Sequence, residues 1–163
     1  MNKDEIMNML KSMKDDPRLK EELLALLIDV LDLRPNRFHP TALINGDPEV
    51  GENVYIGAYS EVNAKGSKII IGNNCDIASY VSINVADSHR LALGTAKDID
   101  RQPITLEENV FVGSHCFIGG GTHISHHSVV GAGTILINGG RIEPYSLIVG
   151  NPARIKPGYF KEK

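Results

Sequence analysis

The sequence predicts a mainly β fold, a parallel β-helix in which short strands coil around one elongated core. The first observation is an aliphatic residue at every sixth position through residues 106–153, namely Leu106, Val112, Ile118, Ile124, Val130, Leu136, Ile142 and Ile148. Because 42% of the chain is hydrophobic, eight such residues in one phase have a chance probability of about one in a thousand. The second observation is a small or modest residue four positions after each repeat start: Val110, Cys116, Thr122, Ser128, Thr134, Gly140 and Ser146. The chain also has 16 glycines and no tryptophan, which suits tight corners between short strands.

The same period extends toward the N-terminus, with starts at Phe38, Ile44, Val50, Ile56 and Val62. The next start, Ile71, comes nine residues after Val62, so we expect the three extra residues to form a bulge or small loop at Lys65-Gly66-Ser67. Ile77 and Ile83 continue the period, which then disappears until Leu106. These segments contain five, three and eight starts. At three hexads per coil they predict about five coils.

Residues 3–33 are the only stretch with helical patterning, and we expect helices at 3–14 and 17–32. Asp15 and Asp16 followed by Pro17 form a start signal for the second helix. The apolar residues of that helix share one face: Leu19, Leu23, Leu26, Leu27, Val30 and Leu31. Because the first coil of a solenoid leaves strand edges and core uncovered, we expect residues 1–36 to form a helical cap. The alternative is that this helix shapes an acceptor pocket. Residues 37–157 are then the β-helix domain, and residues 158–163 a mildly basic tail.

Composition and charge exclude several classes of partner. The formal net charge of −3 argues against a nucleic acid or an acidic membrane surface, which require a basic face. No run of eighteen apolar residues exists, and the first 14 residues mix acidic and basic side chains with apolar ones, so we expect no membrane segment and a cytoplasmic protein. Cys75 and Cys116 both fall on the small position of the repeat, which predicts core packing and no disulfide.

Four phrases carry a family resemblance: Ile71-Gly72-Asn73-Asn74, Val110-Phe111-Val112-Gly113-Ser114, Val130-Gly131-Ala132-Gly133 and Gly150-Asn151-Pro152-Ala153-Arg154. Together they resemble the hexapeptide-repeat acetyltransferases across about residues 50–157, especially the galactoside and maltose O-acetyltransferases and the sugar acetyltransferases of polysaccharide pathways. The resemblance implies a left-handed coil, a homotrimer and an acetyl-CoA site in the groove between neighbouring subunits. The implied activity is acetyl-CoA-dependent transfer of an acetyl group to a hydroxyl, or an amine, of a sugar or sugar-containing acceptor.

The interruption at residues 84–103 is too long for a corner of the β-helix, so we expect it to project as a loop. It contains Asp87-Ser88-His89-Arg90, and the resembled family carries its catalytic histidine in the corresponding loop. Imidazole suits this role because its unperturbed pKa lies near neutral pH. We therefore predict that His89 is the general base, which takes the acceptor proton and later protonates the CoA thiolate. Either Asp87 or a backbone carbonyl could orient the imidazole. From the residues alone, His89 could equally cap a turn beside Asp87.

The resemblance also implies a donor site, made of Phe111, Gly113, Ser114, Gly131, Ala132, Gly133, Arg141, Arg154 and Lys156. The backbone N–H of Ser114 corresponds to an amide that approaches the thioester, so it is the candidate oxyanion donor. Gly131 and Gly133 would let the pantetheine arm approach the backbone, although corner geometry explains these glycines equally well. Arg154 and Lys156 are the candidate phosphate partners, and Arg141 stands in for a lysine that relatives carry in a shorter phrase.

The acceptor and metal assignments are less direct. Tyr59, Glu61, Asn84 and Asp87 are acceptor candidates by location only, because the acceptor-binding residues of the resembled sugar acetyltransferases have no clear counterparts in Gly57–Lys65. Four histidines in neighbouring hexads raise the alternative of a gamma-carbonic-anhydrase-like metalloprotein: His115, His123, His126 and His127. Their spacing differs from that family, so we expect no metal site. A non-catalytic hexapeptide-repeat scaffold is the alternative outside enzymes.

Overall fold

The computed structural model describes residues 2–12, 16–30 and 37–161 of the chain. Two compact units are present, Met1–Pro35 and Asn36–Lys163. The first holds α1 (Lys3–Ser12) and α2 (Pro17–Val30), so both expected helices are confirmed within the described residues. Asp16 Oδ1 accepts the backbone N–H groups of Arg18 and Leu19, at 2.9 and 3.3 Å, and so caps α2. Asp15, Leu31, the expected helix ends at residues 14 and 32 and the domain boundary after residue 36 lie outside the described residues.

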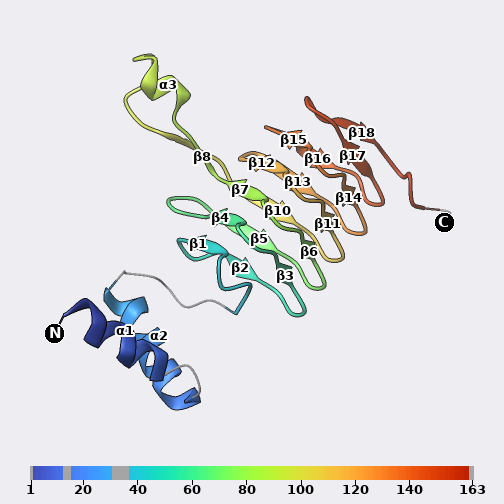
Figure 1. The fold of residues 1–163 in the computed structure, drawn as a ribbon. Helices are drawn as coiled ribbons and strands as arrows, with labels where there is room; N and C mark the ends of the chain where they lie inside the picture. The colour runs from blue at the N-terminus through green and yellow to red at the C-terminus, as the bar shows by residue number, and fades with distance from the viewer. Residues whose placement is uncertain (1, 13–15, 31–36, 162–163) are drawn as a thin grey trace. The chain divides into compact units, whose positions relative to one another are not determined.

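The second unit is built from three parallel sheets, each with one strand from every coil (Figure 1). Sheet A contains β1 (Leu43–Asn45), β4 (Glu61–Asn63), β7 (Ser82–Asn84), β12 (Phe117–Gly119) and β15 (Ile135–Leu136). Sheet B contains β2 (Glu49–Val50), β5 (Ile69–Ile71), β10 (Ile104–Leu106), β13 (Thr122–Ile124) and β16 (Gly140–Ile142). Sheet C contains β3 (Tyr55–Ile56), β6 (Asp76–Ile77), β11 (Phe111–Val112), β14 (Val129–Val130) and β17 (Leu147–Val149). The chain visits the sheets in the order A, B, C, which makes five coils.

The repeat starts stack in register to form the core. In sheet A, the partners run from Ile44 through Val62, Ile83 and Ile118 to Leu136. From Val62 onward these side chains are buried, as are the starts of the other sheets from Ile56 onward. The predicted fold, a left-handed parallel β-helix of about five coils, is therefore confirmed. Its stability rests on stacked aliphatic rows, because each coil alone has no second layer on which to bury its inner face.

The two cysteines occupy the inside positions predicted for them. Cys75 and Cys116 are buried and unbridged. Burial raises the pKa of both thiols, because the thiolate would lose its hydration. The phase slip after Val62 is also confirmed, since the Lys65-Gly66-Ser67 segment forms a turn between β4 and β5.

Residues 84–103 project from the stack as expected (Figure 1), but this segment is more ordered than the sequence predicted. β8 (Ala86–Asp87) and β9 (Asp100–Arg101) pair antiparallel at its base, and α3 (His89–Ala92) follows β8. The expectation that helix is confined to residues 3–33 is therefore wrong. No residue of α3 is buried, so no apolar period marked this helix in the sequence. A second addition is β18 (Arg154–Lys156), which folds back antiparallel onto β17.

Candidate functional site

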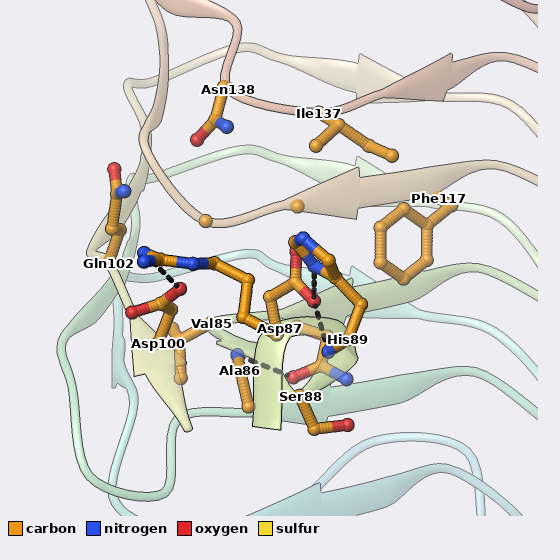
Figure 2. A pocket seen from close by; sticks show the side chains of 14 residues that line it. Val85, Ala86, Asp87, Ser88, His89, Asp100, Gln102, Phe117, Ile137 and Asn138 are labelled. Carbon is orange, nitrogen blue, oxygen red and sulfur yellow. Dashed lines mark hydrogen bonds and ion pairs between the residues drawn. The ribbon is translucent and has the colours of Figure 1, made fainter. Parts of the chain in front are cut away.

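His89 and Asp87 form a carboxylate–imidazole pair at the base of the projecting loop. The Nδ1 atom of His89 lies 2.6 Å from Asp87 Oδ1, and the same oxygen accepts the backbone N–H of His89 at 3.0 Å (Figure 2). Asp87 is thus the orienting group, of the two left open by the sequence. It also caps the local turn, so orientation and capping occur together. With Nδ1–H directed at the carboxylate, Nε2 is left as the proton acceptor.

Hydrogen bonding keeps the Asp87 carboxylate of this pair ionised. The hydrogen bonds from the backbone N–H and the ring of His89 lower the pKa of Asp87, so the carboxylate stays ionised at neutral pH. Both side chains are about half exposed, at 51% for Asp87 and 61% for His89. Solvent can therefore reach His89, and so can a substrate.

The pair opens into a cavity of about 600 Å³ between the loop and the ends of the sheet A strands (Figure 2). Its walls come from four parts of the chain: the end of β7, the loop, β12 with the residue that follows it, and the residues after β15. The lining residues are Asn84, Val85, Ala86, Asp87, Ser88, His89, Arg90, Asp100, Gln102, Phe117, Gly119, Gly120, Ile137 and Asn138. A volume of this size suits a small organic ligand.

The four acceptor candidates divide into two groups. Asn84 and Asp87 line the cavity, whereas Tyr59 and Glu61 do not. Tyr59 lies at the corner between β3 and β4 and stacks on Tyr80, with ring centroids 5.2 Å apart. Glu61 accepts a hydrogen bond from Ser82 at 3.3 Å on the outer face of sheet A.

Sequence reasoning missed most of the lining, notably Arg90, Gln102, Phe117, Ile137 and Asn138. Phe117 and Ile137 left a signal, because an apolar residue next to an inward repeat start must point outward. The others come together only through the loop and the stacking of coils.

Five of the predicted donor residues lie at corners between sheets C and A: Gly113, Ser114, Gly131, Ala132 and Gly133. Ser114 accepts the N–H of Gly133 from the next coil at 2.9 Å, so the two phrases of the resemblance are stacked neighbours. Within the described chain, the backbone N–H of Ser114 makes no hydrogen bond and remains able to donate to a ligand. Gly133 has φ +72°, and a Cβ placed there would meet no atom within 4 Å. The corner therefore offers a free donor next to an open strip of backbone.

The remaining donor candidates lie on two different sheets. Phe111 is 41% exposed on the outside of sheet C, and exposed Arg154 and Lys156 follow on β18 of the same sheet. Neither cation forms an ion pair with another described residue, so both are available to an anion. Arg141 differs, because it lies in sheet B and its Nη2 is 3.4 Å from Glu107 Oε1.

Ser114 lies outside the His89 cavity of its own chain. It belongs to the corner that precedes β12, whereas the cavity is lined by Phe117 and Gly119 of that strand and by Gly120 after it. One chain therefore does not place the Ser114 amide on the wall of its own His89 cavity.

The other histidines do not form one cluster. His115 stacks on Tyr80, with centroids 4.9 Å apart, whereas His126 and His127 pair through their Nδ1 atoms at 3.0 Å. His123 Nε2 lies 2.6 Å from Glu107 Oε1. Across residues 2–12, 16–30 and 37–161, no group of three or more His, Cys, Asp or Glu side chains is arranged to hold a metal ion. The absence of a metal stays a prediction.

Known proteins share the repeat of this chain. The family model described as the hexapeptide repeat of succinyl-transferase matches residues 49–84 and 103–137, which are the coils on either side of the loop. The chain is a hexapeptide-repeat protein. Among curated hexapeptide-repeat relatives, the galactoside O-acetyltransferase of Escherichia coli is 32% identical over 127 residues. That alignment covers 69% of this chain and 61% of the relative, so the chain spans less than two thirds of that relative's length.

Solved structures share the fold. AntD, an N-acyltransferase from Bacillus cereus in complex with dTDP and 3-hydroxybutyryl-CoA, superposes with a TM-score of 0.64 at 19% identity, covering 74% of this chain and 67% of AntD. The hexapeptide-repeat acetyltransferase VCA0836 from Vibrio cholerae, complexed with acetyl-CoA, superposes with a TM-score of 0.63 at 22% identity, covering 91% and 82%. The resemblance read from the sequence is thus confirmed for the repeat and the fold. No described helix combines the length and the apolar character needed to cross a bilayer.

Proposed function

We propose that the protein is an acetyl-CoA-dependent acetyltransferase whose acceptor is a hydroxyl of a sugar or sugar-containing molecule, with an amine as the second acceptor class to be tested. The observation that carries the proposal is the Asp87–His89 pair, at 2.6 Å, opening into a cavity large enough for a small acceptor. The acyltransferase functions of the relatives support the reaction class. An acetyl-CoA substrate and two unbridged cysteines accord with a cytoplasmic protein.

The proposed reaction is a direct transfer. His89 Nε2 accepts the proton of the acceptor hydroxyl while the hydroxyl oxygen bonds to the thioester carbonyl carbon, and a positioned base of this kind contributes about 10²–10⁴-fold. The backbone N–H of Ser114 donates to the oxyanion that forms. When the carbon–sulfur bond breaks, the imidazolium of His89 returns its proton to the CoA thiolate. The products are the acetylated acceptor and CoA, with no covalent enzyme intermediate.

Two subunits are required for this geometry. Direct attack needs the reacting atoms to meet at about 3–3.5 Å. Within one chain Ser114 does not line the His89 cavity, so we infer that the Ser114 corner of a second copy approaches that cavity. A contact between two different edges of one subunit is heterologous, and such contacts close into rings. Three triangular subunits form the ring that the family resemblance implies, so we infer a homotrimer.

The donor would lie along the Ser114 corner. The pantetheine arm would lie along exposed Ala132 and Gly133, whereas the space above Gly131 is taken by the Val149 side chain. Arg154 and Lys156 face the phosphates. Arg141 is the weakest member of the predicted donor set, because Glu107 already neutralises it.

The direct test is acetyl-CoA turnover, measured as thiol release, with simple glycosides, amino sugars and nucleotide sugars as acceptors. His89→Ala should lower kcat by about 10²–10⁴-fold, because the base is lost. CoA affinity, measured by calorimetry, should stay near wild type. His39, whose Nδ1 lies 3.0 Å from Thr41 Oγ1 and which does not line the cavity, provides the matched control, and His39→Ala should not change kcat. A His89→Ala enzyme that keeps most of its turnover would remove His89 from the mechanism.

Complementation tests the shared site. Gly133→Tyr fills the open strip, and tyrosine already occupies the equivalent corner at Tyr59 and Tyr80 with φ of 57° and 60°, so the fold tolerates it. Neither Gly133→Tyr nor His89→Ala protein should transfer acetyl groups alone. Co-expression should restore part of the activity, because a mixed trimer contains some sites with an intact His89 from one chain and an intact Gly133 from the next. No recovery in verified mixed trimers would refute the intersubunit site.

A further inference from the structure

The cavity beneath the projecting loop combines neutral polar groups, an apolar wall and charges that are already paired. We propose that this cavity is the acceptor site and that it selects a sugar without a phosphate group. The inference rests on the proposed acetyltransferase function and names the class of its acceptor. It concerns Arg90, Asp100, Gln102, Phe117 and Asn138, all of which line the cavity.

The charged side chains of the cavity disfavour a phosphate group. Among the described lining residues, Arg90 is the only side chain with a permanent positive charge, and its Nη1 lies 3.4 Å from Asp100 Oδ2. Asp87 adds a second carboxylate. A sugar phosphate entering the cavity would therefore meet two carboxylates and a guanidinium that already has a partner. Tight binding of a phosphate group requires positively charged side chains that are not already paired. The described residues of the cavity wall supply none.

Neutral amide side chains also line the cavity, at Asn84, Gln102 and Asn138. A Cβ placed on Gly121 would lie 2.5 Å from Gln102 Oε1 and 2.8 Å from Asn138 Oδ1, so the two amide oxygens meet above this glycine. Asn84 Oδ1 is engaged by the N–H of Ala86 at 2.9 Å, which fixes that amide at the cavity wall. Side-chain amides both donate and accept, as sugar hydroxyls do.

The apolar wall supplies a surface for a sugar ring. Phe117 lies at an outward position of β12, in register with Ser82 and Ile135, and Ile137 is 57% exposed. Figure 2 shows the Phe117 ring beside His89, on the side of the cavity opposite Asp100 and Gln102. An aromatic ring provides a flat contact area for the C–H face of a pyranose, while the amides reach its hydroxyls. The acceptor hydroxyl would then sit between this wall and the free nitrogen of His89.

The first experiment compares matched acceptors on the wild-type enzyme. Each unphosphorylated glycoside is paired with its 1-phosphate and with its dTDP derivative, and KM is measured with saturating acetyl-CoA. Calorimetric titration of the same ligands without donor measures acceptor binding independently of transfer. The unphosphorylated sugar should bind at least about tenfold more tightly, the discrimination expected from one unpaired charge.

Variants then assign the selectivity to residues. Phe117→Leu should raise the acceptor KM about tenfold, and Phe117→Tyr should restore it, because only the latter keeps the ring. Tyr55→Leu, which removes an exposed aromatic residue from sheet C, is the matched control. Asp100→Asn frees Arg90, so the ratio of KM for the phosphorylated and unphosphorylated sugars should fall about tenfold. Adding Arg90→Ala should abolish that gain.

The outcomes separate this inference from the function beneath it. CoA affinity, measured by calorimetry, reports the donor side independently of the acceptor cavity. If transfer occurs and depends on His89, but phosphorylated sugars bind as tightly as their neutral partners, the acceptor class is wrong and the acetyltransferase function stands. An unchanged acceptor KM in Phe117→Leu would also refute the proposed site. If no acyl-CoA is turned over with any acceptor, the acetyltransferase function itself fails, whereas calorimetry still tests whether the cavity prefers neutral sugars.

Discussion

Replacement of Asp87 by asparagine tests how the carboxylate positions His89. Asparagine keeps the size of the side chain but removes the charge. Because Oδ1 makes both contacts to His89, the amide either keeps a neutral oxygen there or turns its NH₂ group toward both the ring and the backbone N–H. If the NH₂ group faces Nδ1, it stabilises the tautomer that carries its proton on Nε2, and that tautomer cannot accept the acceptor proton. The expected defect is therefore in kcat, with little change in KM for either substrate.

The exposure of the pair sets the size of this effect. In a fully buried Ser-His-Asp triad the equivalent change costs about 10⁴-fold in kcat. Here the side chains of Asp87 and His89 are 51% and 61% exposed, so water can replace part of the lost interaction. We expect a decrease of about 10–100-fold in kcat, smaller than for His89→Ala. The lowered pKa of Asp87 means that the stabilisation from its hydrogen bonds to His89 is present above the unfolded value near 3.8 and is lost only as pH falls through the lower folded pKa. Assays between about pH 6 and 9 therefore compare an ionised carboxylate with a neutral amide.

Steady-state thiol release at saturating donor gives kcat, and calorimetry with CoA confirms that the donor site is intact. Asp98→Asn, at an exposed carboxylate of the same loop, controls for the loss of one negative charge and should keep wild-type kcat. A kcat within twofold of wild type in Asp87→Asn would show that the carboxylate does not position the base. A loss as large as that of His89→Ala would refute the argument from exposure.

Three further predictions follow from other parts of the structure. Burial raises the pKa of Glu107, but the hydrogen bonds from His123 and from the N–H of His126 outweigh it and lower the pKa overall. Glu107→Gln should therefore lower the free energy of unfolding by about 1–2 kcal/mol at pH 7, and the difference should narrow as pH falls below the unfolded value near 4.5, measured by urea titration at each pH. Arg154→Ala should weaken CoA binding about tenfold with little change in kcat at saturation, and unaltered affinity by calorimetry would exclude this residue as a phosphate partner. Gly72→Ala places a Cβ 2.7 Å from the backbone carbonyl carbon of Glu107 and should destabilise the fold by about 1–3 kcal/mol in thermal unfolding, whereas a wild-type melting temperature would show that the coils can separate at no cost.

The hexapeptide period made the β-helix predictable before any coordinates. Each inward position had to be aliphatic or small, so the interior left a regular trace in the sequence, and Ile118 and Cys116 are buried as that trace required. The break in the period likewise located the loop that carries His89. The same reasoning failed for α3 and β18. Both are exposed additions to the β-helix, so no buried face requires apolar residues to repeat along them.

The sequence by itself determined the repeat, the number of coils and the position of the interruption, because these follow from which residues face one continuous core. Tertiary structure alone decided that Asp87 orients His89, that Arg141 is paired with Glu107, and that Gln102, Phe117 and Asn138 share a cavity. Those residues come from a loop and from different coils, and they meet on the outside of the β-helix. Outward positions are free to vary without disturbing the core, so only the folded chain brings them together.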